Sequence, residues 1–330
     1  MEIGSFIELQ WPQRLEFYSG DESRGMEIAR LNSGKAALFH AFRVTACQAI
    51  WLPVYLCDCV RDFFQRKNIK IHFYHIDRNF EPIDLKFTKN EAVLLVNYYG
   101  MMSETRMRKL AAKYQHVIID NCQAFFARPL ENCQNVYSCR KFIGVPDGAY
   151  VIGKNAVTLQ DEYPQGYSSD TALFLLQRIE YGCEGKAYQS RTVNENRVES
   201  EDIMKMSKLT RVILDGTDYQ NIQKKRRENF QYADSLFRNF NCLSPDQFSD
   251  TFCVPMVYPF LAESNDLLGV LQANKHFQGH WWSYLLDENS SDSVEYWLSR
   301  YIIPITIDQR YGKEELDFLY QIVTKTLKRK

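Results

Sequence analysis

An acid and an amine that could do chemistry together, Asp120 and Lys141, lie in the middle of the chain. Asp120 ends an apolar, β-branched run at residues 117–120, and Lys141 follows in a short loop that leads to a Pro-Asp-Gly turn at residues 146–148. A buried parallel strand delivers a single charge in this way to the edge of an α/β sheet, where ligands bind. The spacing therefore predicts a site in which an acid and an amine serve one ligand.

One cofactor needs this combination. Pyridoxal 5'-phosphate requires a lysine that reacts with its aldehyde and an acid that holds the proton on its ring nitrogen. Asp120 would hold that proton, and Gln123, about one turn further on, would reach the phenolic oxygen of the ring or pack beneath it. The competing interpretation is structural: Asp120 caps a strand end or forms a salt bridge.

The surroundings of Lys141 distinguish it from an ordinary surface lysine. Its neighbours include Cys139, Phe142 and Val145, which predict partial burial, and Arg140 adds a second positive charge. Burial and a like charge both lower the affinity of an amine for its proton, so that it can attack a carbonyl carbon. A solvated lysine in a charged pair remains the alternative.

A phosphate group would find donors near the start of the chain. Residues 26–31 are expected to form a strand, residues 32–34 a tight turn, and residues 35–43 a helix. Gly34 lets the backbone present free amides at the helix start, where the dipole favours an anion, and Ser138 could add a hydroxyl. Taken alone, the turn is also typical of an ordinary glycine-containing connection.

Bulk composition excludes several functional classes. Of 330 residues, 45% are hydrophobic and 14% aromatic, while the formal net charge is −1, which argues against disorder and against nucleic acid as a main partner. The nine cysteines are scattered, residues 1–5 lack a secretory leader, and no apolar run has the length of a membrane helix. These features predict a soluble protein of the reducing cytoplasm.

Strand and helix patterns alternate through the first half of the chain, which predicts an α/β fold with a mostly parallel, helix-covered central sheet. The expected strands cover residues 49–55, 69–76, 92–96, 117–120 and 150–153, and the expected helices residues 60–66, 103–114 and 171–181. Residues 184–201 are polar and are expected to be irregular and mobile.

The second half predicts a smaller α+β domain. Its apolar segments lie at residues 252–259 and 301–305, a long helical stretch lies within residues 203–237, and a closing helix covers residues 313–325. The expected division is a large cofactor-binding domain at residues 1–214 and a small C-terminal domain at residues 215–330.

The pair Cys57 and Cys59 could suggest a metal site. No second Cys/His pair follows at a zinc-like spacing, so no metal is predicted.

Several segments together resemble the DegT/StrS-type sugar aminotransferases, which use pyridoxal phosphate and have the aspartate-aminotransferase-like fold, type I. The matching segments are Ser-Gly-Lys-Ala-Ala-Leu at 33–38, Leu-Pro-Val-Tyr at 52–55, Val-Asn-Tyr-Tyr-Gly at 96–100, Asp-Asn-Cys-Gln at 120–123, Ser-Cys-Arg-Lys at 138–141 and Pro-Asp-Gly-Ala at 146–149.

The resemblance assigns roles to individual residues. It implies that Lys141 is the catalytic lysine and that a further set holds the cofactor: Gly34, Lys35, Ala36 and Ser138 at the phosphate, Asp120 at the ring nitrogen, and Gln123 and Tyr55 at the ring. Related dehydratases carry histidine in place of this lysine, so Lys141 favours transamination.

The resemblance also implies a function. Family members are homodimers that transfer an amino group, usually from glutamate, to a nucleotide-linked keto-sugar, in the biosynthesis of sugars such as those of cell-surface polysaccharides. Lys35 replaces a frequent threonine, Ala149 a second glycine, and residues 203–206 differ from the family's Asn-Tyr-Arg-Met element. The alternatives are another reaction of the same cofactor, elimination or racemisation, and a non-catalytic sensor or scaffold derived from such an enzyme.

Overall fold

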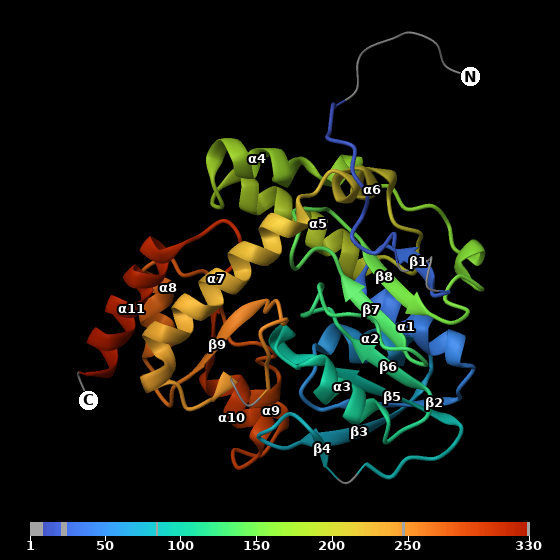
Figure 1. Ribbon diagram of the computed structural model, residues 1–330, viewed down its shortest axis with the longest axis horizontal. Coiled ribbons are helices and arrows are strands. Elements are labelled where there is room, and N and C mark those ends of the chain that lie inside the picture. Colours follow the sequence, from blue (N-terminus) through green and yellow to red (C-terminus); the bar gives the residue numbers. More distant parts are fainter. Residues whose placement is uncertain (1–8, 21–24, 84, 246–247, 329–330) are drawn as a thin grey trace.

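The structure is a computed structural model that describes residues 9–20, 25–83, 85–245 and 248–328 (Figure 1). The prediction that residues 1–5 carry no leader lies outside these residues. Within the described part of the chain, no helix combines the length and the apolar character needed to span a bilayer.

An eight-stranded sheet forms the centre of the molecule, with the order β1-β8-β7-β6-β5-β2-β3-β4 (Figure 1). Strands β2, β3, β5, β6 and β7 pair with one another in parallel. The pairs β1–β8, β7–β8 and β3–β4 are antiparallel. The strands are β1 (Glu27–Leu31), β2 (Ala49–Pro53), β3 (Lys70–Ile76), β4 (Pro82–Ile83), β5 (Glu91–Val96), β6 (Val117–Asp120), β7 (Gln134–Ser138) and β8 (Ala149–Gly153). The predicted α/β class is confirmed.

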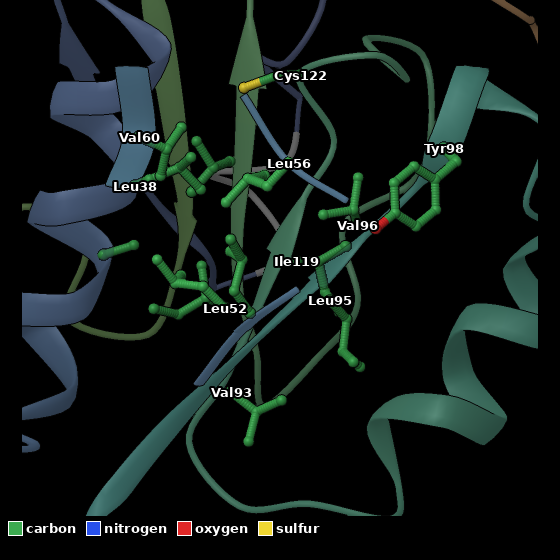
Figure 2. Close-up of a cluster of buried hydrophobic side chains, with 14 of the residues drawn as sticks. Leu38, Leu52, Leu56, Val60, Val93, Leu95, Val96, Tyr98, Ile119 and Cys122 are labelled. Carbon is green, nitrogen blue, oxygen red and sulfur yellow. The ribbon is translucent and has the colours of Figure 1, made fainter. Parts of the chain in front are cut away.

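The central strands are buried on both faces because helices cover the sheet on each side. Every residue of β6 is buried, and β5 is buried from its second residue onward. Figure 2 shows part of this core, with Leu38 of a neighbouring helix near Val60 and Ile119 of β6 near Leu95 of β5. Burial of each such side chain contributes about 1.5–3 kcal/mol.

The α-helices that the structure describes in the first half of the chain are α1 (Gly34–Thr45), α2 (Asp58–Arg66) and α3 (Glu104–Ala111). Helix α1 packs against β7 and β8, and α2 packs against α1. Ser33 and Ser103 cap α1 and α3, each accepting a hydrogen bond from the third amide beyond it. Serine is favoured at this position because it satisfies an amide that has no acceptor within the helix.

Helices α4 (Leu173–Tyr181) and α5 (Lys186–Ser200) pack against each other at the outside of the molecule (Figure 1). The helix expected at 171–181 is confirmed. The expectation of an irregular segment at 184–201 is wrong, because residues 186–200 form α5. The ion pairs Arg191–Glu195 and Arg197–Glu201 each join residues one helical turn apart and support the helix. The buried side chain of Asn194 anchors it to the rest of the chain.

A separate hydrophobic core lies away from the large sheet, where Phe237, Tyr258, Leu271 and Val323 pack together. It is built mainly from α7 (Tyr219–Phe237), β9 (Val257–Leu261), α8 (Leu267–Ala273), β10 (Ile302–Thr306) and α11 (Lys313–Leu327); α6 (Lys208–Asp215), α9 (Leu285–Glu288) and α10 (Val294–Tyr301) complete this half. The apolar segment at 252–259 becomes strand only from Val257 onward. The domain boundary at 214/215 stays a prediction.

Candidate cofactor site

Asp120 lies at the carboxyl end of β6, in the interior of the sheet. Its strand is flanked by β5 and β7, with Asp120 opposite Val96 on one side and Val136 on the other. The side chain is 6% exposed, and its Oδ1 atom accepts a hydrogen bond of 2.8 Å from the backbone amide of Cys122. That bond fixes the orientation of the carboxylate at the strand end.

Lys141 lies in the connection between β7 and β8, the strands that pair Ser138 with Ala149. The neighbours Cys139 and Phe142 are buried, but Lys141 itself is exposed in the single chain, so the expected partial burial is wrong. The neighbours fill the inside of the connection and leave the lysine on its outer side.

The charge of Lys141 nevertheless acts on the residues around Asp120. It lowers the pKa of the Cys57 thiol, after the larger effects of a hydrogen bond from Cys59, which lowers it, and of burial, which raises it. Burial, followed by the charge of Asp120, raises the pKa of the Cys122 thiol, and the charge of Lys141 acts in the opposite direction. Lys141 therefore shares one electrostatic environment with the end of β6.

Buried polar contacts hold the β7–β8 connection in place. Asp147 has no exposed surface and accepts hydrogen bonds from Ser207 Oγ at 3.0 Å, from the Ser207 amide at 3.2 Å and from Thr210 Oγ1. Burial raises the pKa of Asp147, and these three hydrogen bonds oppose the rise. The carboxylate thus ties the connection to the start of α6.

The backbone conformation at residue 148 requires a glycine. Its φ is +113°, and a Cβ atom there would lie 2.8 Å from Thr210 Cγ2. Its amide donates to the carbonyl of Asn32 at 2.8 Å, which links the connection to the segment before α1. A side chain at this position would meet both strain and a clash.

Helix α5 contacts the same connection from outside. Asn194, which is fully buried, donates through Nδ2 to the carbonyl of Pro146 at 2.8 Å. Arg140 forms an ion pair with Glu195, so the positive charge expected to act on Lys141 is paired with a carboxylate.

The start of α1 meets the ends of two strands. A Cβ atom at Gly34 would lie 3.0 Å from Cys122 Sγ and 3.8 Å from Ser138 Cβ. Ser33 Oγ accepts from the amide of Ala36 at 3.3 Å, and the other amides of a first helical turn have no acceptor within the helix. Gly34 thus lies close to Ser138, and the predicted contacts of Gly34, Ala36 and Ser138 with a phosphate stay predictions.

Lys35 points to a different partner. Its side chain is 6% exposed, and Nζ donates to the backbone carbonyl of Glu199 near the end of α5. Burial lowers the pKa of Lys35, with Glu199 and Cys59 opposing the effect. Its predicted contact with a phosphate stays a prediction.

Gln123 and Tyr55 meet at Tyr99, in the short 3-10 turn η2 (Tyr98–Gly100). Gln123 Oε1 accepts from the Tyr99 amide at 2.7 Å, and the hydroxyls of Tyr55 and Tyr99 lie 2.7 Å apart. The ring of Tyr55 stands edge-on to Trp282, with a centroid distance of 4.4 Å. Both residues stabilise the turn beyond β5, and their predicted contacts with a cofactor ring stay predictions.

The segment at residues 203–206 is bound to its own chain. The Asn32 amide donates to the carbonyl of Met204 at 3.0 Å, Asn32 Oδ1 accepts from the Met204 amide at 3.2 Å, and Lys205 forms a β-bridge with Leu31.

Sequence reasoning missed the cysteines of the site. Cys57 and Cys59 lie at the start of α2 with their Sγ atoms 2.9 Å apart, and Cys122 lies beside Gly34. The signal in the sequence is the Cys-Asp-Cys motif that follows the segment at 52–55, whose pairing of two thiols does not depend on a metal. In the described residues no three His, Cys, Asp or Glu side chains gather as a metal site would require.

Comparisons with known proteins give the fold. No protein-family model matches the sequence, and no curated protein sequence is similar to it. The sugar aminotransferase CalS13 from Micromonospora echinospora superposes with a TM-score of 0.61 at 14% identity, covering 94% of this chain and 93% of that one. PseC from Helicobacter pylori, an aminotransferase of pseudoaminic acid biosynthesis, gives 0.59 at 15%, covering 92% and 87%.

A dehydratase has the same architecture. GDP-4-keto-6-deoxy-D-mannose-3-dehydratase from E. coli, a structure with bound hydrated PLP, gives a TM-score of 0.56 at 13% identity and covers 95% of this chain and 99% of that one. The likeness runs over nearly the whole length in each case. The chain therefore has the fold of these enzymes.

Proposed function

We propose that this protein is a pyridoxal-phosphate-dependent aminotransferase of the DegT/StrS type, which transfers an amino group from glutamate to a nucleotide-linked keto-sugar. The observation that carries the proposal is the convergence of Gly34, Cys122 and Ser138, which brings the start of α1 to the ends of β6 and β7. The full-length likeness to sugar aminotransferases supports it. So does a further neighbour of the same fold, NtdA from Bacillus subtilis, whose solved structure contains the bound cofactor PMP.

The side chains present fit this cofactor. First-turn amides of α1 and the hydroxyl of Ser138 are donors for a phosphate, and the close approach at Gly34 leaves no room for a side chain there. Asp120 is a buried carboxylate whose direction is fixed, as a partner for a protonated ring nitrogen requires. When bound, the cofactor supplies the electron sink that makes a substrate carbon acidic.

The chain's own residues would handle protons and position. Lys141 would accept a proton from the substrate carbon and return it to another, and it is free to move because its side chain is exposed. Asp120 would keep the proton on the ring nitrogen. Gln123 would act through the turn at Tyr99, which it holds by its hydrogen bond to the Tyr99 amide.

A second copy of the chain would cover α4 and α5. None of the residues of α4 is buried, and exposed apolar side chains gather there and on α5: Leu173 at 50%, Leu176 at 57%, Ile179 at 83%, Tyr181 at 60%, Tyr188 at 60% and Val193 at 58% exposed. A group of exposed apolar side chains on two helices that pack together is a candidate interaction site. Because α5 also contacts the Lys141 connection, a homodimer formed here would place the partner next to the site.

We place the protein in the cytoplasm and its reaction in the synthesis of sugars such as those of cell-surface polysaccharides. All nine cysteines, each of which lies in the described part, are free thiols, as is usual in a reducing compartment. Elimination or racemisation on the same cofactor is the alternative reaction, and product analysis with glutamate and a keto-sugar nucleotide separates the three outcomes.

The test is spectroscopic. Purified protein mixed with pyridoxal phosphate should develop a visible absorption band that shifts when glutamate is added and 2-oxoglutarate is released. Lys141→Ala should lose the band, whereas the matched control Lys154→Ala, an exposed lysine just beyond β8, should keep it. A protein that stays colourless would support the non-catalytic alternative, and a band that survives in Lys141→Ala would refute the assignment.

A further inference from the structure

The Cys57–Asp58–Cys59 motif holds two thiols close together, and the proposed function gives these thiols no role. The two Sγ atoms lie 2.9 Å apart. Cys57 is the N-cap of α2, and Asp58 is the first helical residue, so the dimensions of a helix put the two Cα atoms about 5.4 Å apart. That value lies inside the range of about 4.4–6.8 Å that a disulfide spans, and the sulfurs need to approach by less than about 1 Å to bond.

The charges around the motif make the two thiols unequal. The pKa of Cys57 is lowered, mainly by the hydrogen bond from Cys59 and further by Lys141, against the effect of burial. The pKa of Cys59 is raised by its neighbour Cys57 and by burial. The positive charge of Lys35 also interacts electrostatically with both thiols. A thiolate at Cys57 beside a protonated Cys59 is the arrangement of an attacking and a resolving thiol.

Both thiols can be reached from outside. Cys57 and Cys59 are partly exposed, whereas Cys122 is buried. The exposed carboxylate of Asp58 accepts from the Cys59 amide at 2.8 Å and thereby fixes the turn between them. A small oxidant therefore meets the pair before it meets the third cysteine of the site.

We propose that Cys57 and Cys59 form a reversible dithiol–disulfide couple at the mouth of the candidate cofactor site, oxidised by a low-molecular-weight disulfide such as oxidised glutathione. The Cys57 thiolate attacks one sulfur of the disulfide, whose S–S bond breaks, and the first glutathione leaves as a thiolate that takes up a proton. Cys59 then loses its proton to water, attacks the sulfur of Cys57 and releases the second glutathione.

The electrons balance within this exchange. Two protein thiols lose two electrons and two protons, and one glutathione disulfide becomes two glutathione thiols. Oxidation replaces the thiolate that faces Lys141 and Lys35 with an uncharged disulfide. The couple belongs to the polypeptide, so it operates whether or not the protein is an aminotransferase.

The test uses the reduced full chain without cofactor, in glutathione buffers of graded oxidised-to-reduced ratio, followed by acid quenching, alkylation and mass spectrometry. Cleavage after Arg43 and Arg61 yields the peptide 44–61, which contains Cys47, Cys57 and Cys59. We expect this peptide to lose the mass of two hydrogens, to escape alkylation at Cys57 and Cys59, and to recover on reduction. An unoxidised peptide at every ratio overturns the proposal without reference to any variant.

Three variants separate the roles. The matched control Cys47→Ser should keep the disulfide, because Cys47 lies outside the pair. Cys59→Ser should stop at a glutathione adduct on Cys57, and Cys57→Ser should react at least about tenfold more slowly. A disulfide that involves Cys47 or Cys122, or equal reactivity of Cys57 and Cys59, contradicts the assignment. Circular dichroism of each reduced variant establishes that it is folded.

Discussion

The β7–β8 connection and the α4–α5 pair lie next to each other and are stabilised in opposite ways. Asp147 in the connection is completely buried and accepts three hydrogen bonds, and Gly148 fits a space that excludes any side chain. Helix α4 buries none of its residues, and Ile179 is 83% exposed. One region is completed by the chain itself, and the other presents the exposed apolar side chains that the proposed homodimer would bury.

The largest effect is expected inside the connection. Asp147→Ala leaves Ser207 and Thr210 with buried polar atoms that lack their acceptor, so we expect the free energy of unfolding to fall by about 3 kcal/mol or more. Urea unfolding measures it. The control Asp170→Ala removes an exposed carboxylate and should change the free energy by less than about 0.5 kcal/mol. Equal effects would show that the connection is not held by Asp147.

A smaller effect is expected on the exposed helix. Ile179→Glu should leave unfolding of the monomer almost unchanged but raise the dissociation constant of the dimer about tenfold or more, since a buried isoleucine contributes about 1.5–3 kcal/mol. Sedimentation at graded concentrations measures this. The control Phe318→Glu changes an exposed aromatic residue of α11, 49% exposed, and should leave the dimer intact. Dimers that survive Ile179→Glu would exclude this surface as the interface.

The smallest effect lies at the contact between the two regions. Glu195→Gln removes the ion pairs of Glu195 with Arg140 and with Arg191. Because the side chain of Glu195 is 42% exposed, we expect a loss of less than about 1 kcal/mol that disappears in concentrated salt. Unfolding at two ionic strengths measures it. The control is the ion pair Arg108–Glu104, which joins residues one turn apart on α3. Glu104→Gln should cause a similarly small loss of stability that also disappears in concentrated salt. A loss insensitive to salt would mean that Glu195 acts by packing.

Most strands of the large sheet could be predicted from the sequence because they are rich in apolar residues and end in polar ones. The run at 117–120 is the clearest example, and it delivered Asp120 to its place in the sheet. The two-residue strand β4 and β7, which begins with Gln134 and Asn135, are not among the expected strands. Helix α5 could not be predicted in this way, since only Ala187, Asn194 and Val198 are buried. They share one face of the helix, but one of the three is polar, so the face is not an apolar stripe. Its stability depends on side-chain pairs and on contacts with the rest of the chain.

The surroundings of the lysines depend on contacts between residues far apart in the sequence. Lys35 bonds to the carbonyl of Glu199, and Lys141 acts on Cys57 and Cys122. Neither relation follows from local pattern, because it requires the packing of α1, α2 and α5 around one edge of the sheet. The sequence therefore indicates which residue types could form a site, and the fold decides how they are paired.

The central claim is that Lys141 is the lysine that bonds to the cofactor, and chemical trapping tests it directly. Protein incubated with pyridoxal phosphate and reduced with borohydride should carry the cofactor on the peptide that contains Lys141. Lys35, the buried lysine of the same site, serves as the internal comparison. Labelling at Lys141 with little at Lys35 is the predicted result, and labelling at Lys35 or spread evenly over exposed lysines would contradict the account.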